Sequence, residues 1–279
     1  MTTSTTQCPL CGGPARPHLT LPHTQVFRCA GGQCDLQFAS PQLNDHDLAQ
    51  AYAQLYYRPD GSQPVLENTP EPDIRHLLDR LSRKFGSLSG KCILDYGCGN
   101  GLLLKIANEL GARATGVEQS STAREGIARE GFATVYADLA ALHQAEPAAQ
   151  FDLIILSEVI EHLRRPWDDL EQLSPLLTRS GSVVLLTPNF ASLNSRLHAA
   201  GWEQRTNLTH LFYFTPRSLA AVLRRAGYDP IALPPISWHS SHDLLRRQLQ
   251  HMLCATGLQG GLFFCGQLRA ATSVARAAS

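Results

Sequence analysis

The chain has 279 residues, room for one large domain and a small appendage, and 24 Lys and Arg balance 24 Asp and Glu. A formally neutral chain offers no basic field to hold a long phosphate backbone, so nucleic acid is a poor expected partner. No apolar run approaches the ~18 residues of a membrane span, and residues 1–7 lack the basic and apolar stretches of a secretion signal. We therefore expect a cytoplasmic protein, whose eight cysteines are metal ligands or buried apolar residues before they are disulfides.

Two cysteine pairs lie near the start of the chain. Their members are Cys8, Cys11, Cys29 and Cys34. Four thiolates on two such turns form a closed tetrahedral zinc site, and a site with no open position is structural rather than catalytic. Residues 1–40 are therefore predicted to be a zinc-ribbon-like module that its metal folds. Two alternatives stay open: unpaired surface cysteines, or His18 or His23 in place of one cysteine ligand.

Residues 41–90 are predicted to connect this module to the main domain. Apolar residues recur at helical spacing over 48–57 and over 74–85, with a turn and an irregular stretch between. Three tyrosines of the first helix are candidate residues of a lid over an active site: Tyr52, Tyr56 and Tyr57. Aromatic side chains that simply pack the helix are an equally good interpretation.

The most informative segment is 93–101. A short apolar run ends in Asp95, the glycines Gly97, Gly99 and Gly101 alternate after it, and an apolar stretch with helical spacing follows over 102–110. This order predicts a strand, a tight turn and a helix. Glycine lets such a turn take positive φ and lets the backbone approach a ligand closely, and the N-terminus of the helix offers unpaired N–H groups.

Further strands are predicted to end in polar side chains. The second, 114–118, ends in Glu118, which is well placed to bind ribose hydroxyls. A third segment ends in Asp138, a fourth strand spans 151–157, and a fifth spans 181–189. A nicotinamide-binding Rossmann unit is the alternative, but its fingerprint is G-x-G-x-x-G rather than three alternating glycines.

In order and spacing, these motifs resemble the class I S-adenosylmethionine-dependent methyltransferases over roughly residues 75–235. The resemblance implies a Rossmann-like α/β fold with a mostly parallel seven-stranded sheet and helices on both faces, here over residues 91–279. It implies that the glycine loop holds the methionine part of the cofactor, that Glu118 holds the ribose and that Asp138 lies near the adenine. The implied cofactor-binding residues are Asp95, Gly97, Cys98, Gly99, Gly101, Glu118, Gln119, Asp138, Leu139 and Ser157.

A second group of polar residues follows the fourth strand. Glu158, Glu161 and His162 would share one turn of helix, and His210 comes from the connection after strand five. This pattern resembles the E-x-x-E-H of ubiquinone-pathway O-methyltransferases and the metal site of small-RNA 2′-O-methyltransferases. The resemblance implies a second divalent metal on these four residues. The alternative without metal stays open, in which His162 packs or caps and His210 orders the lid or acts as general base.

The rest of the chain is predicted from weaker patterns. Residues 190–214 form a long connection that we interpret as a substrate cover, rich in aromatic residues that suit a ring-bearing or apolar substrate, although Trp202 suits the core as well. A helix over 218–226, a strand over 231–236, a helix over 243–253 and a last strand within 262–275 follow. Cys254 and Cys265 are expected to be buried apolar residues.

The sequence thus predicts an enzyme that transfers a methyl group from S-adenosylmethionine to a small molecule, most simply at a hydroxyl oxygen. Metal-dependent methylation of RNA 2′-hydroxyls is a second hypothesis, which the neutral charge disfavours. A non-catalytic protein, with the zinc module binding another protein and a vestigial cofactor fold, is a third. The intact Gly97, Gly99, Gly101 and Glu118 argue against the third.

Overall fold

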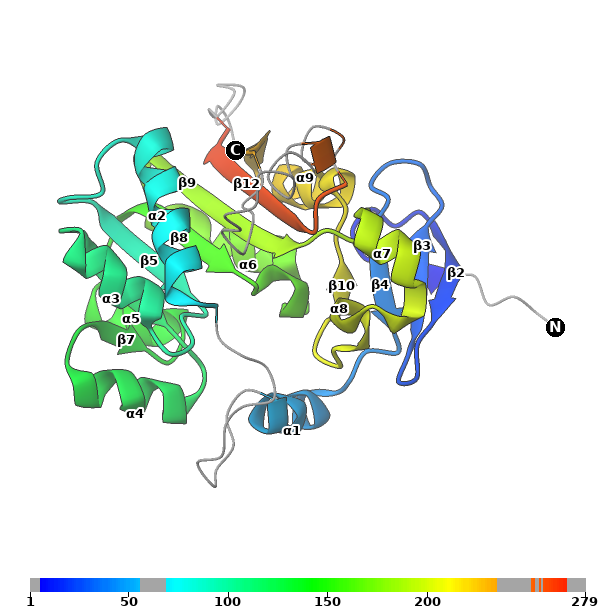
Figure 1. Ribbon diagram of the computed structural model, residues 1–279, viewed down its shortest axis with the longest axis horizontal. Coiled ribbons are helices and arrows are strands. Elements are labelled where there is room, and N and C mark those ends of the chain that lie inside the picture. The colour runs from blue at the N-terminus through cyan, green and yellow to red at the C-terminus, as the bar shows by residue number, and fades with distance from the viewer. Residues whose placement is uncertain (1–5, 56–68, 235–251, 254–255, 257, 270–279) are drawn as a thin grey trace, which may run out of the picture.

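The computed structural model describes residues 6–55, 69–234, 252–253, 256 and 258–269. These residues build two sheets, and Figure 1 shows the larger one with helices on both faces and the smaller one beside it. The predicted helix over 243–253 falls almost wholly outside the described residues, as do Tyr56, Tyr57 and Cys254.

The larger sheet has seven strands in the order β11-β12-β9-β8-β5-β6-β7. Five strands from β7 to β9 are parallel, and β12 and β11 are antiparallel additions at one edge. The strands are β5 (Cys92–Tyr96), β6 (Arg113–Val117), β7 (Thr134–Tyr136), β8 (Phe151–Ser157), β9 (Leu177–Pro188), β11 (Tyr228–Ala232) and β12 (Gly261–Leu268). The predicted Rossmann-like architecture is confirmed.

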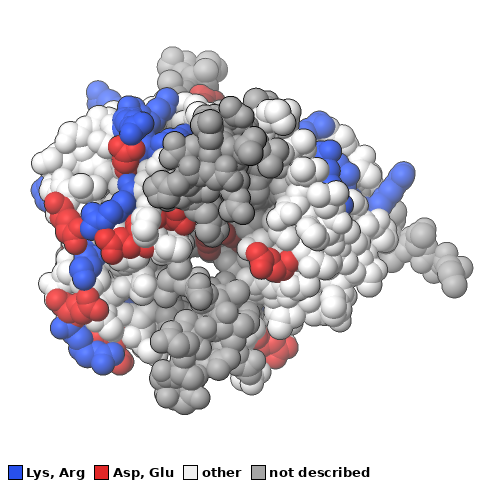
Figure 2. Space-filling model, in the orientation of Figure 1, with Lys and Arg blue, Asp and Glu red and all other residues white. Residues whose placement is uncertain are grey.

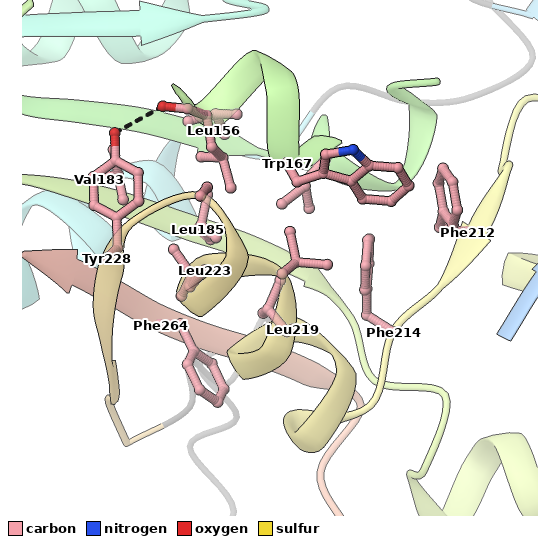
Figure 3. Packing of buried hydrophobic residues seen from close by; sticks show 14 of the residues in the cluster. Leu156, Trp167, Val183, Leu185, Phe212, Phe214, Leu219, Leu223, Tyr228 and Phe264 are labelled. Atoms are coloured by element: carbon pink, nitrogen blue, oxygen red, sulfur yellow. Dashed lines mark hydrogen bonds between the residues drawn. The ribbon is translucent and has the colours of Figure 1, made fainter. Parts of the chain in front are cut away.

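Helices cover both faces of this sheet because its central strands are apolar on both sides. On one face pack α2 (Glu71–Phe85), α3 (Leu102–Glu109) and α4 (Ser121–Glu130). On the other pack α5 (Leu139–Ala145), α6 (Pro166–Leu173) and α9 (Pro216–Arg225). In Figure 3, Leu219 and Leu223 of α9 lie against the sheet residues Val183, Leu185 and Phe264, and the Tyr228 hydroxyl donates to the carbonyl of Leu170 at 2.8 Å.

The chain order puts the functional segments at one place. From β5 it runs outward to β6 and β7 and returns to β8 on the other side of β5. The strand order therefore reverses between β5 and β8. In an open parallel sheet, ligands bind outside the carboxyl ends of the strands at such a reversal. The glycine loop after β5 and Glu158 after β8 both lie there.

The smaller sheet has the order β1-β2-β3-β4-β10. Its first four strands come from the N-terminal module: β1 (Thr6–Gln7), β2 (Pro14–Thr20), β3 (Gln25–Cys29) and β4 (Gln37–Ser40). Its fifth, β10 (Phe212–Tyr213), comes from the connection after β9 and pairs antiparallel with β4. The N-terminal module and the main domain thus share a sheet, with α1 (Asp45–Leu55) following β4.

Several predicted segments differ from the structure; the fifth strand, for example, begins four residues earlier than predicted, at Leu177. The connection over 190–214 carries α7 (Leu193–His198), α8 (Glu203–Thr206) and β10, together with a 3-10 turn at Ala199–Gly201. Its aromatic residues Phe190, Trp202 and Tyr213 are buried against one another and against the N-terminal sheet. These three rings therefore pack the cover onto its neighbours.

The sixth strand begins three residues earlier than predicted, at Tyr228, and ends at Ala232. Pro230 lies within it, which an edge strand tolerates because a proline there removes no essential ladder hydrogen bond. No helix in the described part of the chain is long and apolar enough to cross a membrane.

Candidate functional site

The loop after β5 depends on glycine at three alternating positions. Gly97, Gly99 and Gly101 have φ of 82°, 54° and 77°, a region that L side chains rarely adopt. A Cβ on Gly97 would also lie 2.6 Å from Cγ2 of Val159. The loop leads directly into α3, whose N-cap is Gly101. The result is a turn at the carboxyl edge of the sheet in which three of the five residues 97–101 have no side chain, so that a ligand can approach the backbone closely.

Two carboxylates lie beside this loop. Glu118 accepts from the N–H of Gly99 at 2.9 Å and from the N–H of Ser120 at 2.8 Å, so both of its oxygens are oriented by backbone. Asp95 is buried, with 3% of its surface exposed. Burial, and secondarily the charge of Glu118, raises the pKa of Asp95 to about 7. The site thus holds a carboxyl group that ionises near neutral pH.

The other predicted cofactor-binding residues have mixed surroundings. Cys98 is buried in the apolar cluster beneath α2 and α3, and a Cβ on Gly116 would lie 2.7 Å from its Sγ. Asp138 caps α5 by accepting from the N–H of Ala141 at 2.8 Å, and Leu139 packs against the core. Gln119 is exposed, and the hydroxyl oxygen of Ser157 is buried without a hydrogen-bond partner among the described residues.

Beyond β8 the chain brings three predicted residues together. Glu161, His162 and His210 each offer a ligand atom, and these atoms lie within 4.8 Å of one another. Glu161 is fully buried: its Oε2 accepts from the hydroxyl of Thr187 at 2.9 Å, and its Oε1 has no hydrogen-bond partner among the described residues. Nε2 of His162 lies 4.0 Å from that Oε1. The imidazole rings are 4.7 Å apart, edge to face.

Backbone carbonyls fix the tautomer of both histidines. Nδ1 of His162 lies 3.0 Å from the carbonyl oxygen of Thr209, and Nδ1 of His210 lies 2.6 Å from that of Gln204. A carbonyl can only accept, so each Nδ1 carries the proton and each Nε2 carries the lone pair. Burial lowers the pKa of His162 to about 4 and, with a smaller effect of His162, that of His210 well below its usual value. Both rings are therefore neutral near pH 7.

The fourth predicted member, Glu158, is not among the residues whose ligand atoms converge, and it lies before the 3-10 turn Ile160–His162 instead of sharing a helical turn with Glu161, although the two carboxyl groups interact. Burial raises the pKa of Glu158 to about 7, although a hydrogen bond from Glu161 lowers it. Burial, and then the charge of Glu158, raises the pKa of Glu161 well above its usual value. Glu158 has φ of 56°, which is rare for a residue with a side chain, and its N–H donates to the carbonyl of Leu186 at 2.9 Å. Strained backbone of this kind is concentrated at functional sites.

Sequence reasoning missed the residues that orient this group. Asn207 donates from Nδ2 to Nε2 of His210 at 3.2 Å, and its Oδ1 accepts from the N–H and hydroxyl of Thr209 at 3.0 and 2.7 Å. These two bonds to Oδ1 fix which end of the amide faces His210. The hydroxyl of Thr187 orients the carboxyl group of Glu161 by donating to its Oε2. The only sequence signal is the short segment Asn207–His210, where several side chains with hydrogen-bonding groups cluster.

The four cysteines of the N-terminal module converge as well. The Sγ atoms of Cys8 and Cys34 are 3.6 Å apart, and Sγ of Cys11 lies 3.5 Å from those of Cys29 and Cys34. Zinc bonded tetrahedrally to four thiolates at about 2.3 Å sets neighbouring sulfurs about 3.8 Å apart. The cluster is therefore close to the size that zinc requires. His18 and His23 are not part of it.

Comparison with known proteins gives the family. A methyltransferase domain family matches residues 67–233. A ubiquinone biosynthesis O-methyltransferase of Nitrosococcus oceani is 35% identical over 174 residues, 58% of this chain and 74% of the relative. One of Ruegeria pomeroyi is 29% identical over 185 residues, 60% of this chain and 75% of the relative.

Solved structures agree on the fold. A Burkholderia thailandensis 1,6-didemethyltoxoflavin-N1-methyltransferase with bound S-adenosylhomocysteine matches with a TM-score of 0.55 at 16% identity, over 91% of this chain and 99% of that one. A plantazolicin methyltransferase in complex with S-adenosylhomocysteine matches with a TM-score of 0.54 at 18% identity, over 80% of this chain and 96% of that one. The chain belongs to the class I S-adenosylmethionine-dependent methyltransferases, enzymes that here transfer a methyl group to a small molecule.

Proposed function

We propose that the enzyme methylates a hydroxyl oxygen of its small-molecule acceptor. The observation that carries this proposal is the buried group of Glu161, His162 and His210 at the carboxyl edge of β8, next to the cofactor loop. A hydroxyl must lose its proton as its oxygen attacks the sulfonium methyl, and a neutral imidazole has a lone pair that can accept it, with a neighbouring carboxylate stabilising the imidazolium that forms. The similarity to ubiquinone biosynthesis O-methyltransferases supports an oxygen acceptor.

In this proposal the chain has two tasks. The glycine loop, Asp95 and Glu118 hold the cofactor, which supplies the reactive methyl group. The group around Glu161 holds the acceptor oxygen in line with that methyl and receives its proton, so positioning provides much of the rate. The carbonyls of Thr209 and Gln204 keep both imidazole lone pairs on Nε2, and that of His210 accepts from Asn207, a bond that the proton of the acceptor hydroxyl would replace.

A divalent cation also fits this group. The buried Oε1 of Glu161 lacks a partner among the described residues, and a carboxylate with two imidazoles is a ligand set that divalent cations accept. Glu161, His162 and His210 would hold it, with Glu158 close by. When bound, the cation would lower the pKa of the acceptor hydroxyl.

The acceptor class is tested by methyl transfer from deuterated S-adenosylmethionine to a panel of phenols and catechols, with matched thiols, amines and short RNAs. Mass spectrometry locates the label. Labelled ether products would support the proposal. Label found only on nitrogen, on sulfur or in RNA would contradict it. On the face shown in Figure 2, basic and acidic side chains of the described residues are interspersed, which suits a small acceptor better than RNA.

We further propose that Cys8, Cys11, Cys29 and Cys34 hold one structural zinc ion. Protein purified without added metal is expected to contain one zinc per chain by elemental analysis. The double variant Cys11→Ser, Cys34→Ser is expected to lose it and to melt at lower temperature, because metal binding and folding of such a small module are coupled. Cys265→Ser, which alters a buried cysteine of β12 far from the cluster in sequence, is the matched control. If the double variant still contained one zinc ion per chain, the proposed zinc site at these four cysteines would be wrong.

Cofactor affinity is expected to rise with pH through the range in which Asp95 ionises. Its pKa is raised to about 7 in the free protein, and the positive charges of S-adenosylmethionine favour the ionised carboxylate. Binding then releases a proton below about pH 7, so affinity increases from about pH 5.5 to 8 and levels off above. Calorimetry in buffers of different ionisation enthalpy measures both the affinity and the released proton.

Stability of the free protein should move in the opposite direction. Unfolded Asp has a pKa of about 4, so between pH 4 and 7 the unfolded chain loses this proton while the folded chain keeps it, and stability declines as pH rises. Asp95→Asn isolates the effect from other groups that titrate nearby. If cofactor affinity depended on pH in Asp95→Asn as it does in the wild type, a group other than Asp95 would cause that dependence.

A further inference from the structure

Leu211 links the N-terminal module to the catalytic group by two backbone hydrogen bonds. The N–H of Ala39, in β4, donates to the carbonyl of Leu211 at 2.9 Å, and the N–H of Leu211 donates to the carbonyl of Glu161 at 2.9 Å. His210 precedes Leu211 directly, and β10 follows it, with Phe212 paired to Phe38. The backbone that carries His210 and contacts Glu161 is therefore registered against a strand of the cysteine module.

Two arginines of helix α9 donate hydrogen bonds to the backbone of both cysteine turns. Arg225 donates from Nη1 to the carbonyl of Leu10, between Cys8 and Cys11, at 2.7 Å. Arg217 donates to the carbonyl of Gly32, in the turn between Cys29 and Cys34. One helix of the main domain thus contacts the backbone of both turns whose thiolates form the cluster.

Aromatic packing links these contacts to β10. The guanidinium of Arg225 lies 5.1 Å from the ring centre of Trp167, and the Trp167 and Phe212 rings are 6.0 Å apart, edge to face. Figure 3 shows Trp167 directed toward Phe212 and Phe214. The cysteines Cys8, Cys29 and Cys34 belong to the same hydrophobic cluster as these rings. The described residues of the module thus share their apolar clusters with the main domain.

The cofactor half of the site is linked to the module less directly. Among the described residues no hydrogen bond joins the glycine loop or Glu118 to the module, although Leu94, Val117 and Leu139 belong to or pack against the same apolar cluster as the cysteines. The glycine loop and Glu118 follow β5 and β6, and the apolar cluster beneath α2 and α3 contains no residue of the cysteine module among the described residues. Strand β10 is a short edge strand, so its position depends on β4. Displacing β4 would therefore act first on Leu211 and His210, and on Glu161 through its hydrogen bond with Leu211, rather than on the cofactor loop.

We propose that zinc at the four cysteines positions the acceptor half of the active site, with Arg225 as a positioning residue between the cysteine turn and Trp167. The inference rests on the zinc site and on the catalytic group proposed above. Loss of the metal releases the two turns from each other, frees β4 and shifts β10. Turnover then falls while cofactor binding persists, because misplacement of reacting groups by about 1 Å costs roughly 10²-fold in rate.

The test reads the two histidines directly. Side-chain nitrogen NMR of the full chain reports the tautomer and surroundings of His162 and His210, assigned by single substitution. Wild type, Cys11→Ser and Arg225→Ala are compared, all after the same treatment with a weak chelator, so that a cation at Glu161 contributes nothing. Zinc content and affinity for S-adenosylhomocysteine are measured on the same samples. Arg224→Ala, next to Arg225 on the exposed side of α9, is the control.

We expect Cys11→Ser and Arg225→Ala to move the ring signals of His210, with S-adenosylhomocysteine affinity unchanged and, in Arg225→Ala, zinc retained. Arg225→Lys, which keeps a donor and a cation over Trp167, should restore the signals in part. Unmoved histidine signals in both variants would overturn the inference, as would equal loss of cofactor binding. None of these readouts requires the acceptor, so they stand if the proposed hydroxyl chemistry fails.

Discussion

Gly99→Arg is expected to abolish measurable binding of S-adenosylmethionine and S-adenosylhomocysteine. Gly99 has φ of 54°, and its N–H donates to Glu118 at 2.9 Å, so it lies where the glycine loop meets the carboxylate proposed to bind the ribose. An arginine there would pair with Glu118 and fill the space of a nucleoside. Loss of a charge-assisted hydrogen bond alone costs about 1.5–3 kcal/mol, so with the steric conflict we expect at least about 100-fold weaker binding. Calorimetry with both ligands measures it.

The matched control is Gly131→Arg. Gly131 has φ of 67° at the C-cap of α4, and a Cβ there would meet nothing within 4 Å. Arginine at this position carries similar backbone strain, but at the C-terminal end of α4 instead of in the loop that precedes α3. Thermal melting of both variants separates loss of binding from loss of fold. A Gly99→Arg protein that binds as well as Gly131→Arg would place the cofactor away from this loop.

The parallel core could be predicted because its signals are local. Strand β8 spans Phe151–Ser157, the same residues as predicted, and residues 153–156 within it are continuously apolar, since a strand buried on both faces needs no polar alternation. The glycine loop follows from positive φ at three alternating positions, which glycine adopts readily. Sequence reasoning therefore predicts the structure correctly where a backbone conformation, such as positive φ, requires one residue type.

The site depends on contacts that no local pattern contains. Strand β10 has only Phe212 and Tyr213, and its partner β4 lies far away in the sequence. Nothing near His210 predicts that its Nδ1 will meet the carbonyl of Gln204, a backbone atom supplied by α8. The positive φ of Glu158 is likewise a property of the assembled sheet edge. These features arise from tertiary packing, which overrides local preference.

Glu161→Gln and His210→Ala are each expected to slow methyl transfer by roughly 10²–10⁴-fold, the usual effect of removing a general acid–base group. The amide introduced by Glu161→Gln can still accept from the Thr187 hydroxyl but carries no charge, so this variant tests the buried carboxylate with little change in packing. Removal of the His210 ring takes away one of two neutral imidazoles that each offer a ligand atom within 4.8 Å of that carboxylate. Initial rates with the acceptor identified from the phenol and catechol panel measure the loss, and calorimetry should show unchanged affinity for S-adenosylhomocysteine.

Three comparisons separate chemistry from folding in this prediction. His210→Gln fills most of the same buried volume and should be as slow as His210→Ala, whereas His198→Ala, an exposed histidine of the same cover, should keep the wild-type rate. If a divalent cation occupies the group, chelation should stop turnover without releasing the cofactor, and added metal should restore it in wild type but not in Glu161→Gln. If no cation is required, chelation should change nothing and both substitutions should remain slow. Wild-type rates in Glu161→Gln and His210→Ala would contradict the proposed role of this group both with and without a cation. The proton of the acceptor would then be accepted by another group.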